Sequence, residues 1–122
     1  MSKQNQLMAA LDRLNKAVPS IKGSLLSTLD GISIVHVIND PAVDPARVAA
    51  MSATAIGVAK RISETLKVGQ SREISLQASE GRVFIYLVGS KACLSLVTLS
   101  DSNTGLIQLE VADAIEQLNT IL

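Results

Sequence analysis

The sequence contains few aromatic residues and a balanced set of charges, and both features limit what it can bind. Phe84 and Tyr86 are the only aromatic residues, so the hydrophobic core has to be built from Leu, Ile, Val and Ala. The aromatic side chains on which single-stranded nucleic acids stack are therefore missing. Eleven basic residues balance eleven acidic ones, and no basic patch for phosphate groups stands out. We expect no nucleic-acid partner.

Residues for catalysis and metal binding are equally scarce. Cys93 is the only cysteine, which excludes an intrachain disulfide and a cysteine-based metal cluster. His36 is the only histidine, with Asp40 as its one nearby carboxylate, so a zinc site lacks ligands. Gly89 and Gly105 are not part of a glycine-rich phosphate loop. We expect no enzyme activity, no catalytic residue, no metal and no cofactor.

Long apolar runs are absent as well. The N-terminal segment has no uninterrupted apolar region of the kind found in signal peptides, and no run is long enough to span a membrane. We therefore expect a cytoplasmic protein without a membrane span. With 122 residues, of which 48% are hydrophobic, the chain is predicted to form one globular domain over residues 1–122.

Apolar periodicity and turn residues predict the order of the elements. Four apolar residues between Leu7 and Val18 recur at helical spacing, and Pro19 ends that helix. Asp30-Gly31 predicts a hairpin turn between strands at 21–29 and 32–38. Asp44 is the expected N-cap of a long helix from Pro45 to Lys67, with Gly69 as the glycine just beyond its end.

The C-terminal half is predicted to contain three strands and a closing helix. "SREISLQA" alternates apolar and polar residues, whereas "RVFIYLV" and "ACLSLVTL" are apolar on both faces, as expected for covered central strands. Asp101, Ser102 and Asn103 offer N-caps for the last helix. The predicted order is helix, two strands, helix, three strands, helix, which is an α+β fold.

The middle helix has two unlike apolar faces when residues 46–68 are placed on a wheel at about 100° per residue. Its larger apolar residues fall within an arc of about 100°, the usual width of a core-facing stripe. We predict that this arc faces the core. Its members are Val48, Met51, Ala55, Val58, Ala59, Ile62 and Leu66.

The opposite face of the helix is small and apolar for three turns, where a surface helix should be polar. A glycine inside a helix usually has a packing reason, so Gly57 indicates that another backbone approaches this face. The alternative is a solvated face, because alanine is the best helix former. We favour an interface with a helix of another chain, extended by the third strand, and predict as its residues Ala46, Ala49, Ala50, Ala53, Ile56, Gly57, Lys60, Arg61, Glu64, Ile74 and Leu76.

Four stretches together resemble the roadblock superfamily, which includes dynein light chains, Ragulator scaffold subunits and MglB-like proteins. They are "VPSIKGSLLSTLDGISIVHV", "AAMSATAIGVAKRISETL", "GRVFIYLVGSKACLSLVTL" and "NTGLIQLEVADAIEQL", and they cover nearly the whole chain. The resemblance implies a five-stranded antiparallel sheet with the middle helix on one face and the terminal helices on the other. It also implies dimers in which middle helices pack together and third strands join the sheets.

The resemblance further implies a non-catalytic scaffold or regulator that binds a small Ras-like GTPase, either activating it as MglB-like proteins do or only scaffolding it. The alternative is a structural adaptor of a motor or signalling complex without GTPase regulation. A small-ligand sensor is a third class, but such pockets are usually lined with aromatic residues. The sequence leaves homodimer and heterodimer open, and a homodimer is the default expectation.

Overall fold

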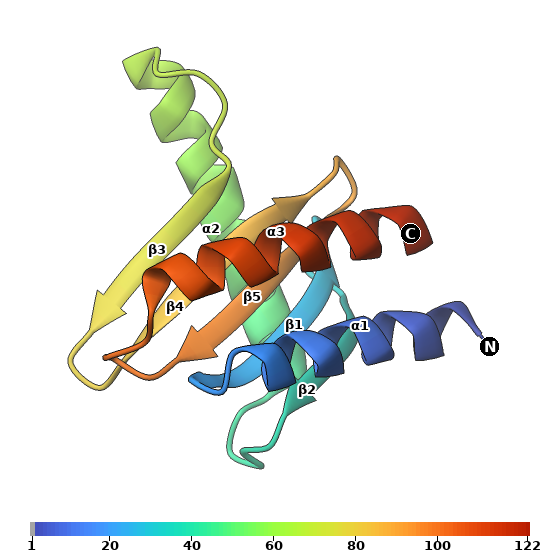
Figure 1. The fold of residues 1–122 in the computed structure, drawn as a ribbon. Coiled ribbons are helices and arrows are strands. Elements are labelled where there is room, and N and C mark those ends of the chain that lie inside the picture. The colour runs from blue at the N-terminus through green and yellow to red at the C-terminus, as the bar shows by residue number, and fades with distance from the viewer. Residues whose placement is uncertain (1) are drawn as a thin grey trace.

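Eight elements follow one another in the predicted order (Figure 1) in the computed structural model, which describes residues 2–122. The strand and helix bounds lie within a few residues of the expected ones. They are α1 (Lys3–Ala17), β1 (Ile21–Thr28), β2 (Ser33–Ile38), α2 (Pro45–Leu66), β3 (Glu73–Ala78), β4 (Gly81–Val88), β5 (Ala92–Thr98) and α3 (Thr104–Ile121).

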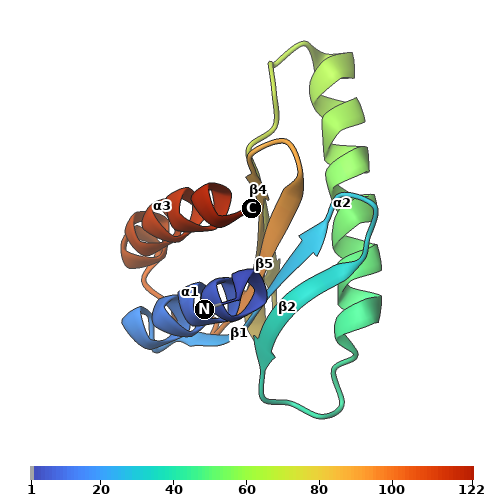
Figure 2. The same ribbon diagram turned by 90° about the vertical axis from the view of Figure 1, so that its right-hand side faces the viewer.

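The five strands form one antiparallel sheet in the order β2-β1-β5-β4-β3, so β2 and β3 are its outer strands. Helices α1 and α3 cover one face of the sheet and α2 crosses the other (Figure 2). The expected α+β architecture is confirmed. At the β2 edge, the Asn15 side chain of α1 donates a hydrogen bond from Nδ2 to the Val37 carbonyl at 3.3 Å.

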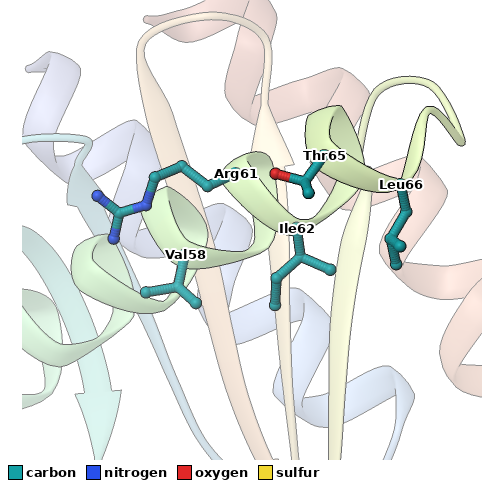
Figure 3. A pocket seen from close by; sticks show the side chains of 5 residues that line it. All are labelled: Val58, Arg61, Ile62, Thr65 and Leu66. Carbon is teal, nitrogen blue, oxygen red and sulfur yellow. The ribbon is translucent and has the colours of Figure 1, made fainter.

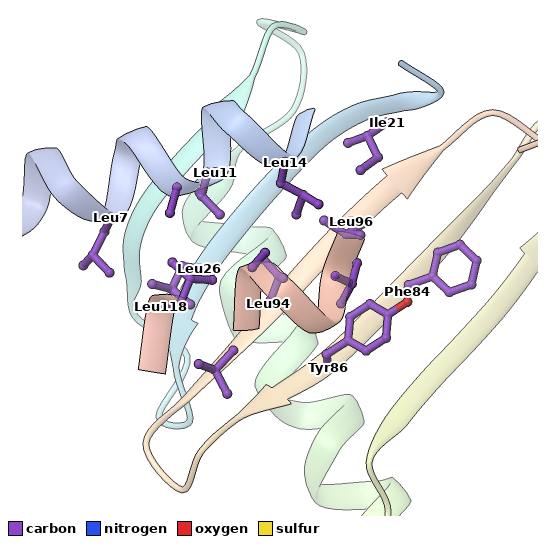
Figure 4. Packing of buried hydrophobic residues seen from close by; sticks show 14 of the residues in the cluster. Leu7, Leu11, Leu14, Ile21, Leu26, Phe84, Tyr86, Leu94, Leu96 and Leu118 are labelled. Atoms are coloured by element: carbon purple, nitrogen blue, oxygen red, sulfur yellow. The ribbon is translucent and has the colours of Figure 1, made fainter. Parts of the chain in front are cut away.

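The hydrophobic core lies between the sheet and the pair α1 and α3 (Figure 4). The predicted stripe of α1 is buried there, and Leu118 of α3 packs against the same cluster. Within residues 2–122, this cluster takes no member from α2 or β3. Its buried members are Leu7, Ala10, Leu11, Leu14, Val18, Ile21, Leu26, Val35, Phe84, Tyr86, Val88, Ala92, Leu94, Leu96, Ile107, Val111, Ala114 and Leu118.

Helix α2 faces the sheet with its small residues, so the prediction that its large-residue arc faces the core is wrong. The buried residues of α2 are Ala49, Ser52 and Ser63. The Ser95 hydroxyl of β5 donates to the Ser52 hydroxyl at 2.8 Å, which ties the helix to the sheet through a polar contact. The arc's exposed members are Met51, Val58, Ile62 and Leu66. The wheel sorts residues into faces, but it does not say which face meets the sheet.

The backbone that approaches the small-residue face closely belongs to this chain's own β1–β2 turn. Gly31 has φ +90°, and a Cβ built on it would lie 3.1 Å from Ala50 Cα and 3.6 Å from Ala53 Cβ. This turn therefore needs glycine both for its backbone conformation and for the close approach to α2. Gly57 differs, because a Cβ built on it meets nothing within 4 Å.

Helix α2 ends at Lys67, as predicted, but Lys67 itself adopts the left-handed conformation, and the glycine expected to close the helix, Gly69, lies two residues further on. Lys67 has φ 57°; its N–H donates to the Glu64 carbonyl at 3.2 Å, and the Val68 N–H donates to the Ser63 carbonyl at 3.1 Å. This pair of bonds is the Schellman motif, which usually places glycine at this position. A residue with a Cβ pays roughly 1–2 kcal/mol for the left-handed region.

The two glycines of the α2 region give opposite predictions for stability. Gly31→Ala should lower the free energy of unfolding by about 1–3 kcal/mol, because the new Cβ meets backbone at a positive φ. Gly57→Ala should raise it by about 0.5–1 kcal/mol, because an open helix position gains a better helix former. Urea unfolding followed by circular dichroism at one fixed protein concentration measures both. Equal effects of the two variants would contradict the placement of the turn against α2.

The single tyrosine predicts a loss of stability at high pH. Tyr86 is 5% exposed, and burial, with a smaller contribution from Glu73, raises its pKa from 10.0 to about 12. The folded state therefore keeps a proton that the unfolded state has lost. The stabilising contribution is complete below pH 10, and roughly 2–3 kcal/mol is lost as the pH rises through about 12. Tyrosinate absorbance and urea unfolding below pH 10 and near pH 12 measure this, and a free phenol titrating near pH 10 in folded protein would refute it.

Candidate functional site

The outward side of α2 carries a row of exposed apolar side chains, which we call the outer stripe: Met51, Val58, Ile62 and Leu66. Their spacing of seven, four and four residues places them along one side of the helix. Between 40% and 66% of each residue is exposed. A hollow of about 380 Å³ lies on this side, lined by Val58, Arg61, Ile62, Thr65 and Leu66 (Figure 3).

The outer strand β3 adds apolar side chains on the same side of the molecule. Ile74 pairs with Ile85 and Ile85 with Ser95, so these three residues point to one face of the sheet. That face carries α2, because Ser95 bonds to Ser52 of the helix. Leu76, two residues beyond Ile74, points the same way and is 52% exposed. Within residues 2–122, no strand pairs with the free edge of β3.

Exposed apolar surface is concentrated in this region. Among the described residues ten large hydrophobic residues are exposed, and six of them lie between positions 51 and 76. The six residues together present on the order of several hundred Å² of apolar surface, and a contiguous patch of this size is rare on a monomer outside an interaction site. We take the outer stripe and the β3 edge as the candidate functional site. The six residues are Met51, Val58, Ile62, Leu66, Val68 and Leu76.

The predicted interface residues are divided by the fold, and some of them face inward. Ala49 is fully buried against the sheet, so it is not available to another chain, which corrects its place in the predicted interface. Ala53 and Ile56 are partly buried on the same inward side. The close backbone contact that the small residues were expected to make with another chain is made here by the β1–β2 turn at Gly31.

Seven of the predicted residues are exposed, and four of these lie on one flank of α2 and form what we call the exposed strip: Ala46, Ala50, Gly57 and Arg61. Their spacing of four, seven and four residues places them on one flank of α2. Ala50 lies beside the β1–β2 turn, where the neighbouring Ile32 is 64% exposed. The strip therefore consists of three small residues and the guanidinium group of Arg61, and the exposed Ile32 lies beside it.

Lys60 and Glu64 line a cleft between the C-terminal half of α2 and the sheet. The cleft has a volume of about 730 Å³, and its apolar wall includes Leu29, Ile56 and Leu87. In Figure 2 this half of α2 extends beyond the end of the sheet. The C-terminal half of the helix thus has an open cleft on its inner side and the outer stripe on its other side.

Cys93 is the single cysteine of the chain, and it lies in the interior of the structure. Cys93 is fully buried, with Sγ 3.0 Å from the Ser27 hydroxyl. Burial raises the pKa of the Cys93 thiol, and the hydrogen bond with Ser27 opposes that shift only in part. Over residues 2–122 no group of three or more His, Cys, Asp or Glu side chains is placed to hold a metal ion. None of the described helices combines the length and apolar character needed to cross a bilayer.

Comparisons with known proteins agree with this architecture. The sequence profile of the Roadblock/LC7 domain family matches residues 7–98, while no curated protein sequence matches the chain. Myxococcus xanthus MglB has a TM-score of 0.91 at 18% identity, covering 99% of this chain and 90% of that chain. An MglB with a tetrameric arrangement has a TM-score of 0.89 at 18% identity, again covering 99% of this chain and 90% of that chain. A Roadblock/LC7 domain from Streptomyces avermitilis gives 0.86 at 17% identity, covering 93% and 94%.

Proposed function

Because the chain belongs to the Roadblock/LC7 domain family, we propose that it is a cytoplasmic, homodimeric, non-catalytic regulator of a small Ras-like GTPase. The observation that carries this proposal is the apolar outer stripe of α2 on the same side of the molecule as the free edge of β3. Two copies meet through this side, and the GTPase binds along the exposed strip.

A second copy fits this surface better than other occupants do. A free strand edge pairs readily with another strand, and a two-fold axis beside β3 joins two copies of it into one continuous sheet. The same axis lays the two outer stripes against each other, as an isologous interface requires. The exposed apolar area is of the same order as the roughly 800 Å² per partner of a stable interface.

The exposed strip suits a different partner. It lies on the flank of α2 beside the β1–β2 turn, whereas the outer stripe lies on the outward side of the helix, so dimerisation leaves Ala46, Ala50 and Gly57 accessible. Arg61 lies at the border of the two surfaces, because it also lines the hollow beside Val58. Small side chains at Ala46, Ala50 and Gly57 allow a helix or loop of the GTPase to approach the α2 backbone. Arg61 supplies a charge at the rim, where charged groups favour one orientation of the partner.

The dimer is tested with two leucines of nearly equal exposure. Leu66 in the outer stripe is 66% exposed and Leu109 on α3 is 68% exposed. Leu66→Glu should raise the dimer dissociation constant by about 100-fold or more, because a carboxylate would be placed in an apolar interface. Leu109→Glu should leave it unchanged. Light scattering at micromolar concentration reports the mass, which should be twice 12.8 kDa for wild type and Leu109→Glu. A monomeric wild type would redirect the proposal to a heterodimer with another roadblock chain.

The GTPase surface is tested with Gly57→Glu. No atom lies within 4 Å of a Cβ at this position, so the variant should fold and dimerise normally. The longer side chain should block close approach and weaken GTPase binding by about tenfold or more. Titration against the Ras-like GTPases of the same genome, in their GDP and GTP states, measures this with Leu109→Glu as the control. Equal affinity for both states would reduce the role to scaffolding, and no binding to any of them would favour a structural adaptor.

A further inference from the structure

The C-terminal half of α2 has little support from its own chain. Between Gly57 and Leu66, Ser63 is the one residue that the structure describes as buried. The cleft of about 730 Å³ separates this half from the sheet, and the core cluster takes no described member from it. In Figure 2 the last turns of this half extend beyond the end of the sheet. Packing against the protomer therefore does not explain why it is helical.

Local sequence preferences explain it only in part, because Ala59, Lys60, Arg61, Glu64 and Leu66 favour a helix whereas other residues of the segment do not. Gly57 is a poor helix former, and the β-branched Val58, Ile62 and Thr65 follow it within nine positions. Lys67 closes the helix in the left-handed region without the glycine that favours this conformation. Short helices with such a sequence are marginal in water unless one face is packed.

The N-terminal half of the same helix is anchored. The Asp44 carboxylate accepts a hydrogen bond from the Ala46 N–H at 3.1 Å as the N-cap, and Pro45 occupies the first turn. Ala49 and Ser52 are buried, and Ser52 is bonded to Ser95 of β5. The two halves meet at Gly57, and beyond it Ser63 is the one residue described as buried.

We propose that the half of α2 after Gly57 becomes ordered only when a second copy covers the outer stripe, so that the GTPase surface is completed by dimerisation. This inference rests on the proposed dimer. Val58, Ile62 and Leu66 supply the face that the second copy would pack. Gly57 and Arg61 of the exposed strip lie at or beyond the boundary, so the monomer presents only Ala46 and Ala50 in a fixed position.

This arrangement makes GTPase binding and self-association depend on each other. If the GTPase binds only the completed strip, dimerisation raises the affinity for the GTPase, and GTPase binding raises the affinity between the two copies by the same factor. Affinity for the GTPase therefore rises with the concentration of this protein, and the half of α2 after Gly57 acts as the switch. Gly57 weakens the helix at the boundary, so the half of α2 after Gly57 stays unordered in the monomer.

Hydrogen exchange measured by mass spectrometry on the full chain tests the inference, with two variants that break the dimer outside the reporting segment. Met51→Glu changes the anchored half of the outer stripe, and Leu76→Glu changes β3. Met51 and Leu76 are both exposed. In each monomer, amides of residues 57–66 should exchange about 100-fold faster than in wild type. Amides of β1 and β5 should keep their protection, which shows that the rest of the domain is folded.

The controls separate this inference from the dimer itself. Leu109→Glu should keep both the dimer mass and the protection of residues 57–66. Adding Gly57→Ala to Met51→Glu should slow exchange of this segment by several-fold without restoring the dimer, because it strengthens only the helix. Monomeric variants in which residues 57–66 stay protected would overturn the inference and leave the dimer standing. A monomeric wild type would overturn the dimer, and with it the role assigned to the second copy.

Discussion

The one-sided hydrophobic core is the constraint on which the rest of this protein depends. The hydrophobic cluster between the sheet and the pair α1 and α3 has no described member from α2 or β3 within residues 2–122. Helix α2 can therefore lie close to the sheet on small residues, with Ser52 bonded to Ser95 and Ala49 buried. Its large side chains are left exposed on the outward side. The hydrophobic core and the exposed apolar surface of α2 thus lie on opposite faces of one sheet.

Element order and bounds could be predicted because their signals are local. The apolar stripe of α1, the Asp30-Gly31 turn and the Asp44 N-cap each act within a few residues, and the structure has each where it was expected. The orientation of α2 could not be predicted this way. The hydrogen bond that fixes it joins residues 43 positions apart, and the rule that large apolar residues face inward fails when another pair of helices already fills the core.

The candidate site was predictable only where it depends on local sequence signals. The alternation of β3 places Ile74 and Leu76 on one face, but only the sheet order makes β3 an outer strand, and the sequence indicated that position only through the family resemblance. Small residues on α2 led to the prediction of a close approach by a backbone of another chain. They could not indicate that Gly31 of the same chain makes part of that approach, because both partners of a contact must be placed before it can be assigned. The helix ends at Lys67 as expected, but Lys67 and not Gly69 is the left-handed residue that closes it, so a nearby glycine indicates the end of a helix without identifying the capping residue.

The Asn15 side chain has a consequence for how far assembly can proceed. A sheet with two open edges that each accept another copy would polymerise without limit, as fibre-forming proteins do. Here the edge at β2 is met by α1, whose Asn15 amide occupies the Val37 carbonyl at 3.3 Å. An approaching strand would have to displace that amide before it could pair there. The β2 edge is therefore less open to strand addition than the β3 edge.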